Sequence, residues 1–226
     1  MKKLDLTGKD TANIIFQSNG VAIHSDVIEP YNALQTAAFD AGFDMQIASG
    51  FRDFERQLKI WNGKYLGMIP IFDDNQIQLD VDTLEPFERI KAILRFSALP
   101  GASRHHWGTD FDYYDKSTFD QTLGLKLVSS EYQGDGPFAN LHQWLLKNAE
   151  NFGFHFPYLN HNGGIAEEPW HMSYYPLSSG YLELLESEPK ILFDLIINED
   201  IAGKTTILRN FEHILDYYIL NVNRVE

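Results

Sequence analysis

The chain has 226 residues, of which 44% are hydrophobic and 14% aromatic, so a single elaborated domain can bury a sizeable core. Its formal net charge of −14 argues against nucleic acid or an anionic membrane surface as a partner, because both repel an acidic protein. The absence of cysteine excludes disulfides, thiolate metal sites and cysteine nucleophiles.

The first residues contain two lysines but no uninterrupted apolar run and no small-residue cleavage site, so they do not resemble a secretory leader. No window approaches the roughly 18 apolar residues of a membrane-spanning helix. We therefore expect a cytoplasmic protein without a membrane span, or a periplasmic one if a leader has been removed.

Hydrophobic periodicity and turn residues divide the chain into helices and short strands. Residues 1–20 predict an irregular or short-strand lead-in, and residues 66–83 carry signals typical of a loop or short hairpin. The expected helices cover residues 24–43, 53–65, 84–99 and 138–152. The expected strands cover residues 45–50, 109–113 and 169–174.

From residue 177 onward the pattern changes to two or three helices without clustered histidines and carboxylates. We expect an α+β fold in which a small, mainly antiparallel sheet carries the functional residues and helices pack on one side. Residues 1–176 are expected to form this domain. Residues 177–226 are expected to form a C-terminal helical extension, packed on the domain or continuing it.

The candidate chemistry is concentrated in the stretch PGASRHHWGTDFDYYD. It contains His105 and His106, and then Gly108, which permits a tight bend toward the following strand. In that strand Asp110 and Asp112 point to the same face, because side chains alternate. Spacing alone leaves open which histidine and which aspartate would bind a metal, and a buried polar cluster is the alternative.

A second group of polar side chains follows at Glu168 and His171. Pro169 disfavours a helix between them, and a bend there would bring both side chains to one metal. Histidine and carboxylate ligands suit zinc, which in catalytic sites has three protein ligands and a water of pKa about 7. A carboxylate that is not a ligand can take the water's proton, and Arg52 can neutralise the oxyanion.

No G-x-S-x-G, P-loop, G-x-G-x-x-G or H-E-x-x-H motif occurs. Three blocks instead resemble, in order, the signatures of the VanY-type D-alanyl-D-alanine carboxypeptidases: SGFRDFERQ, PGASRHHWGTDFD and EPWH. The members of this family are zinc peptidases that act on peptidoglycan stem peptides. The resemblance covers about residues 20–176. The family pattern S-x-H-x-x-G-x-A-x-D falls on Ser103, His105, Gly108, Asp110 and Asp112.

The resemblance implies the hedgehog-like fold of D-Ala-D-Ala peptidases and a Zn²⁺ site with three ligands: His105, Asp112 and His171. It implies Glu168 as the catalytic base and Arg52 as a residue that binds or polarises the substrate. It also implies that Gln57 and Ser103 contact the substrate near its terminal carboxylate.

One position departs from the pattern, because Asp110 replaces the small alanine and adds a second carboxylate near the metal. It would either support a ligand or contact a cationic group of the substrate, such as the amine of a diamino acid. The expected partners are peptidoglycan-derived peptides, with release of D-Ala from the tetrapeptide (L,D) placed ahead of release from the pentapeptide (D,D). The alternatives are a murein endopeptidase and a non-catalytic binding module that retained the zinc.

Overall fold

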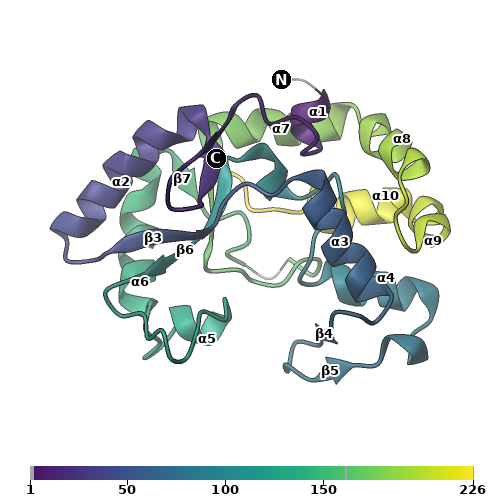
Figure 1. Ribbon diagram of the computed structural model, residues 1–226, viewed down its shortest axis with the longest axis horizontal. Coiled ribbons are helices and arrows are strands. Elements are labelled where there is room, and N and C mark those ends of the chain that lie inside the picture. Colours follow the sequence, from purple (N-terminus) through teal and green to yellow (C-terminus); the bar gives the residue numbers. More distant parts are fainter. Residues whose placement is uncertain (1–2, 161, 226) are drawn as a thin grey trace.

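The computed structural model describes residues 3–160 and 162–225 (Figure 1). Its centre is a four-stranded sheet in the order β3-β6-β8-β7, in which each neighbouring pair is antiparallel. The strands are β3 (Met45–Ser49), β6 (Asp110–Asp115), β8 (His171–Tyr174) and β7 (Phe154–His155). This confirms the predicted small antiparallel sheet within a mixed helix and sheet fold.

Two hairpins form separate small sheets. In the first, β1 (Ile14–Phe16) pairs with β2 (Ala22–His24), which confirms the short strand expected in the lead-in. In the second, β4 (Ile71–Phe72) pairs with β5 (Gln78–Leu79), which confirms the hairpin alternative for residues 66–83.

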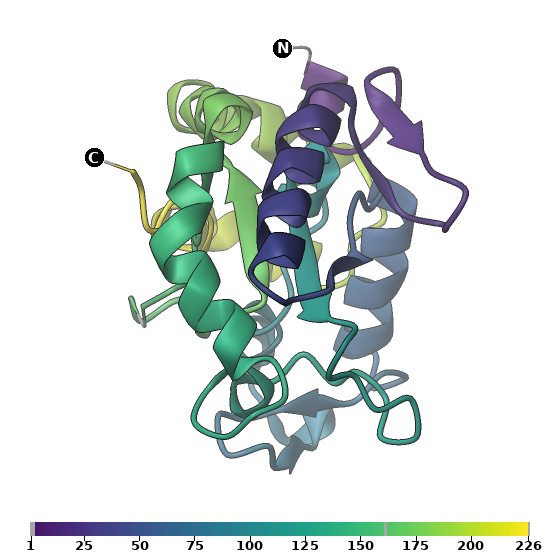
Figure 2. The same cartoon turned by 90° about the vertical axis from the view of Figure 1, so that its left-hand side faces the viewer.

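One face of the central sheet is covered by α2 (Ile28–Asp40) and α6 (Ala139–Asn148), which lie next to each other in Figure 2. Side chains alternate along a strand, and Phe111 of β6 and Met172 of β8 point into this core, where both are fully buried. The residues that flank them on each strand therefore point to the opposite face, where the candidate ligands lie.

Most of the remaining helices gather beside the sheet around a second buried cluster (Figure 1). They are α3 (Phe54–Tyr65), α4 (Pro86–Leu94), α7 (Tyr175–Ser187), α8 (Lys190–Asn198), α9 (Lys204–Arg209) and α10 (Phe211–Ile214), with a π-helix at Leu215–Ile219. Trp61 and Ile90 meet Leu192 and Ile214 in this cluster, and all four are fully buried. The C-terminal helices thus share a core with α3 and α4.

Short helical turns complete the described chain: α1 (Lys3–Leu6), α5 (Ser129–Tyr132), and the 3-10 turns Ser25–Val27, Val81–Thr83, Arg104–Trp107 and Ala149–Phe152. The helix expected over residues 84–99 is shorter and ends at Leu94. Beyond it, the Ser97 hydroxyl accepts a hydrogen bond from Lys64 and the Ala98 carbonyl accepts one from Gln57, so this segment is held irregular. Within the described ranges, every helix is too short or too polar to cross a bilayer.

Candidate metal centre

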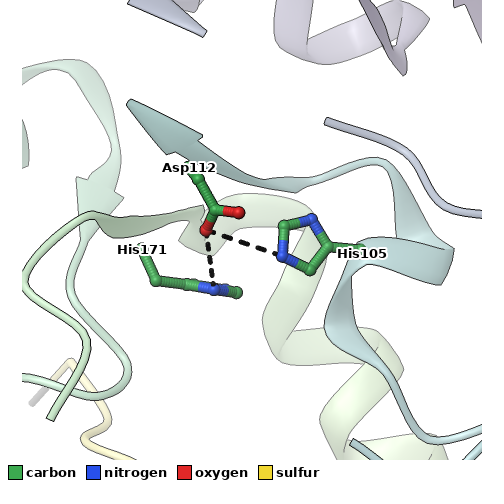
Figure 3. A group of neighbouring side chains, drawn as sticks. All are labelled: His105, Asp112 and His171. Carbon is green, nitrogen blue, oxygen red and sulfur yellow. Dashed lines mark ion pairs between the residues drawn. The ribbon is translucent and has the colours of Figure 1, made fainter. Parts of the chain in front are cut away.

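Three side chains from two strands and one turn converge on one point (Figure 3). Asp112 of β6 and His171 of β8 lie opposite each other in the antiparallel ladder, so their side chains share a face. His105 comes from the 3-10 turn that ends at Gly108, whose φ is 67°. A Cβ at Gly108 would lie 2.8 Å from the backbone nitrogen of His24, so the predicted bend requires glycine.

The ligand atoms of the three residues lie within 4.8 Å of one another. His105 Nε2 is 3.6 Å from Asp112 Oδ1, and His171 Nδ1 is 3.5 Å from the same oxygen. A tetrahedral zinc ion about 2.0–2.1 Å from each ligand atom needs separations of about 3.3 Å between them. Small side-chain movements would bring the set to that geometry.

Hydrogen bonding defines which nitrogen of His105 faces this point. Nδ1 lies 2.8 Å from the Gly50 carbonyl oxygen, which can only accept, so Nδ1 carries the hydrogen. Burial lowers the pKa of His105 to about 3, and the ring is therefore neutral. Its Nε2 presents a lone pair toward Asp112, as a metal ligand must.

Two buried atoms of the three candidate ligands have no hydrogen-bond partner among the described residues: Asp112 Oδ1 and His171 Nδ1. Burial would raise the pKa of Asp112, but His105 and His171 hold it below its usual value. Burial would likewise lower the pKa of His171, but the hydrogen bond to Asp110 and the adjacent carboxylates raise it well above its usual value. A buried site this rich in carboxylates favours a cation, and its nitrogen and oxygen atoms fit zinc.

Glu168 lies beside the ligand set without belonging to it. Its Oε2 is 3.3 Å from His171 Nδ1, and its side chain is 16% exposed. The N–H of His171 donates to the Glu168 carbonyl at 3.0 Å, so residues 168–171 form a turn and the predicted bend at Pro169 is present. This bend places the carboxylate of Glu168 and the ring of His171 on the same side.

A buried pair that the sequence analysis missed supports this turn from within the core. The Tyr113 hydroxyl donates to the Pro169 carbonyl at 3.0 Å and lies 2.7 Å from His142 Nδ1. Since the hydroxyl has one hydrogen, His142 Nδ1–H donates to Tyr113 when Tyr113 donates to Pro169. The two residues are far apart in the sequence, and no local pattern links them.

A cavity of about 250 Å³ opens onto the site and is lined by side chains that include Arg52, Ser103, Leu127, Tyr158, Glu168 and Trp170. Arg52 donates to Gln57 Oε1 at 3.0 Å, and its buried Nε has no partner among the described residues. Gln57 also donates to the Ala98 carbonyl at 2.7 Å and does not line the cavity. Gln57 therefore orients Arg52 through a hydrogen bond made outside the cavity, whereas Ser103 and Arg52 line the cavity.

The second histidine of the motif, His106, points away from the ligand set. Its Nδ1 lies 2.6 Å from the Arg52 carbonyl oxygen, and its Nε2 accepts from the Gly101 N–H at 3.1 Å. Burial lowers its pKa to about 4, so the neutral ring makes both bonds. His106 thereby fixes the backbone that carries Arg52.

The second aspartate of the motif, Asp110, is completely buried and does not line the cavity. It is paired with Arg104 at 2.7 Å and lies 3.1 Å from His171 Nε2. Burial opposes its ionised form, but Arg104 and His171 hold the pKa of Asp110 well below its usual range. Of the two alternatives for this residue, its burial away from the cavity and its contact with His171 favour support of a candidate ligand over contact with a substrate amine.

Comparison with known proteins agrees with the resemblance seen in the motifs. A profile of the VanY family, described as D-alanyl-D-alanine carboxypeptidase, matches residues 20–177, and the chain belongs to this family. An uncharacterized protein of Haemophilus influenzae is 35% identical over 124 residues, which cover 54% of this chain and 93% of that protein. A second uncharacterized protein of that organism is 39% identical over 98 residues, which cover 42% of this chain and 67% of that protein.

Several solved structures share the fold. VanYB in complex with D-Alanine-D-Alanine has a TM-score of 0.52 at 20% identity, covering 82% of this chain and 89% of VanYB. A mutant VanY D,D-pentapeptidase from a VanB-type resistance cassette, in complex with Zn(II), has a TM-score of 0.51 at 20% identity. The match covers 79% of this chain and 88% of that one. The LD-carboxypeptidase LdcB has a TM-score of 0.51 at 18% identity, and the match covers 78% of this chain and 74% of LdcB. At these identities the likeness establishes the common fold.

Proposed function

We propose that this chain is a zinc-dependent carboxypeptidase that releases the C-terminal D-Ala from peptidoglycan stem peptides. The observation that carries the proposal is the convergence of His105, Asp112 and His171, with the Glu168 carboxylate beside them but outside the ligand set. Metal-assisted hydrolysis needs this separation, because a carboxylate that binds the metal is not free to accept a proton.

Each residue has a distinct task in this proposal. His105 Nε2, His171 Nδ1 and one Asp112 oxygen would hold the ion, which would supply Lewis acidity and activate water. Glu168 accepts a proton at its carboxylate and delivers it to the leaving amine. Arg52 faces the cavity with a charge and an N–H that no described residue uses, so it is suited to hold a carboxylate or a developing oxyanion.

The choice of substrate is part of the proposal. VanYB, which shares the fold, was solved with D-Alanine-D-Alanine, and this supports a peptide that ends in D-Ala. We place the tetrapeptide (L,D) reaction ahead of the pentapeptide (D,D) reaction. This order depends on a cytoplasmic location, also proposed, where the enzyme would meet recycled murein tetrapeptides.

Mass spectrometry of the zinc-loaded protein with murein tetrapeptide and pentapeptide, with and without chelator, tests the proposal. Chelator-sensitive loss of one D-Ala from the tetrapeptide is the expected result. Loss from the pentapeptide alone would change the assignment to a D,D-carboxypeptidase. If neither peptide changes, the carboxypeptidase proposal fails, and cross-linked murein is the substrate to examine next.

The role of Glu168 has its own test. Glu168→Gln keeps the shape of the side chain but removes the base, so kcat should fall by about 10²–10⁴-fold while zinc stoichiometry is unchanged. Glu167→Gln is the matched control, because Glu167 is the adjacent carboxylate and does not line the metal-site cavity. Equal turnover of the Glu168→Gln variant and the wild type would refute the assignment of the base.

A further inference from the structure

The buried ion pair between Arg104 and Asp110 lies directly behind the candidate ligands. Arg104 Nε donates to Asp110 Oδ1 at 2.7 Å, and the side chains are only 4% and 0% exposed. Asp110 Oδ2 accepts hydrogen bonds from the Thr109 hydroxyl at 2.7 Å and the Ser173 hydroxyl at 3.0 Å. Arg104 Nη2 also donates to Ser173 at 2.7 Å, so the pair is held in one arrangement.

The Asp110 oxygen that accepts from Arg104 also lies 3.1 Å from His171 Nε2. An ionised carboxylate can only accept, so Nε2 carries a hydrogen. In the neutral ring the lone pair is then on Nδ1, which faces Asp112 at 3.5 Å and Glu168 at 3.3 Å. The contact with Asp110 thus selects the tautomer of His171 that can bind a metal at this point.

We propose that Asp110 is a positioning residue that fixes the tautomer and ring orientation of His171 for metal binding, while Arg104 balances its buried charge. This inference rests on the proposed function, because it takes His171 as a zinc ligand. A histidine ligand commonly donates its second ring N–H to a carboxylate, and loss of that partner lowers metal affinity about 10–100-fold. The family pattern has alanine here, so this support is a departure of the present chain from the pattern.

The competing explanation is that Asp110 only neutralises Arg104. Removing Asp110 alone would leave an unpaired buried guanidinium and destabilise the protein whatever its effect on His171. The double variant Arg104→Met/Asp110→Ala removes the whole pair, so it separates the loss of charge balance from the loss of the histidine's partner.

Two measurements on the full chain distinguish these explanations: the zinc dissociation constant, from competition with a chromophoric chelator, and urea unfolding in excess chelator. The double variant should recover the stability that Asp110→Ala loses, yet bind zinc about 10–100-fold more weakly than the wild type. Asp110→Asn keeps a neutral acceptor oxygen, so its zinc affinity should fall between those of the wild type and the double variant.

Asp115→Asn is the matched control, because Asp115 is a buried carboxylate of the same strand that accepts from the Asp44 N–H at 3.1 Å. It should leave zinc affinity unchanged. Wild-type affinity in both the double variant and Asp110→Asn would overturn the inference, and if the double variant does not fold, Asp110→Asn decides alone. A wild-type protein that binds no zinc would instead refute the proposed function itself.

Discussion

His106→Leu should destabilise the protein strongly at neutral pH and much less at pH 4. In the folded protein the His106 Nδ1–H donates to the Arg52 carbonyl and Nε2 accepts from the Gly101 N–H. Only the neutral ring can make both bonds, and burial lowers the pKa of His106 from 6.5 to about 4. Leucine has a similar volume, but it has no polar atoms in its side chain and does not titrate.

The magnitude of the pH effect follows from the two pKa values of His106. Between pH 6.5 and 4 the unfolded chain binds a proton that the folded chain excludes, so stability falls as the pH falls through this window. About 2.5 pKa units at about 1.4 kcal/mol each give about 3.5 kcal/mol in full, of which about 3 kcal/mol is lost by pH 4, where His106 of the folded chain is half protonated. At pH 7.5 the variant leaves the Gly101 N–H and Arg52 carbonyl without these partners, at a cost of about 1–3 kcal/mol each. The variant's deficit should therefore shrink by about 3 kcal/mol between pH 7.5 and pH 4.

Urea unfolding of the metal-free wild type and of the variant across this pH range measures the deficit, which is the difference between their free energies of unfolding. The variant is compared with the wild type because burial also lowers the pKa of other histidines, namely His24, His105, His142 and His155. A deficit that stays constant with pH would refute the neutral, doubly bonded imidazole. The variant should also retain one zinc per chain, and loss of the metal would show that His106 rather than His105 is the ligand.

Two further perturbations address the metal and the C-terminal segment. Zinc at 100 times its dissociation constant should stabilise the wild type by about 2.7 kcal/mol and raise its Tm by about 5–10 °C, reversibly with chelator. His105→Ala should abolish this zinc-dependent rise in Tm, measured by calorimetry, and an undiminished rise would exclude His105 as a ligand. Asn223→Ala should cost about 1 kcal/mol, because Asn223 Oδ1 accepts from the Leu159 and Asn160 N–H groups at 3.1 and 3.3 Å. Hydrogen exchange in the segment before Glu168 should accelerate, and unchanged exchange would contradict this role of the C-terminal segment.

Residue types and spacing predicted the antiparallel sheet and located the candidate metal site. They did not show which of two neighbouring aspartates, or which of two neighbouring histidines, would bind the metal. Strand alternation put Asp110 and Asp112 on one face, and the pairing of strands separates them. Asp112 lies opposite His171, whereas Asp110 lies opposite Ser173. This register joins segments far apart in the chain, so the local pattern of one strand does not contain it. The resemblance to a family supplied the choice that spacing could not make.

The choice between the two histidines was hidden for a different reason. His105 and His106 lie in a 3-10 turn, where successive side chains diverge by about 120°, so only one of them can face the site. The sequence predicted a bend at Gly108 but not the type of turn before it. The pair Tyr113–His142 was missed because its two residues lie 29 positions apart in the chain, and no local pattern links them.

The β6–β8 ladder links the candidate metal site to the hydrophobic core. Three successive cross-strand pairs form it: Asp110–Ser173, Phe111–Met172 and Asp112–His171. The middle pair is fully buried under α2 and α6, and the outer two pairs point to the opposite face. Because a close-packed interior relaxes only partly, a volume change in the middle pair would be shared between a cavity or strain in the core and a shift of the backbone that carries the outer two pairs. The strand register, held by this core pair, therefore places the candidate ligands and Asp110, whereas the contacts with Gly50 and Asp110 orient the rings of His105 and His171.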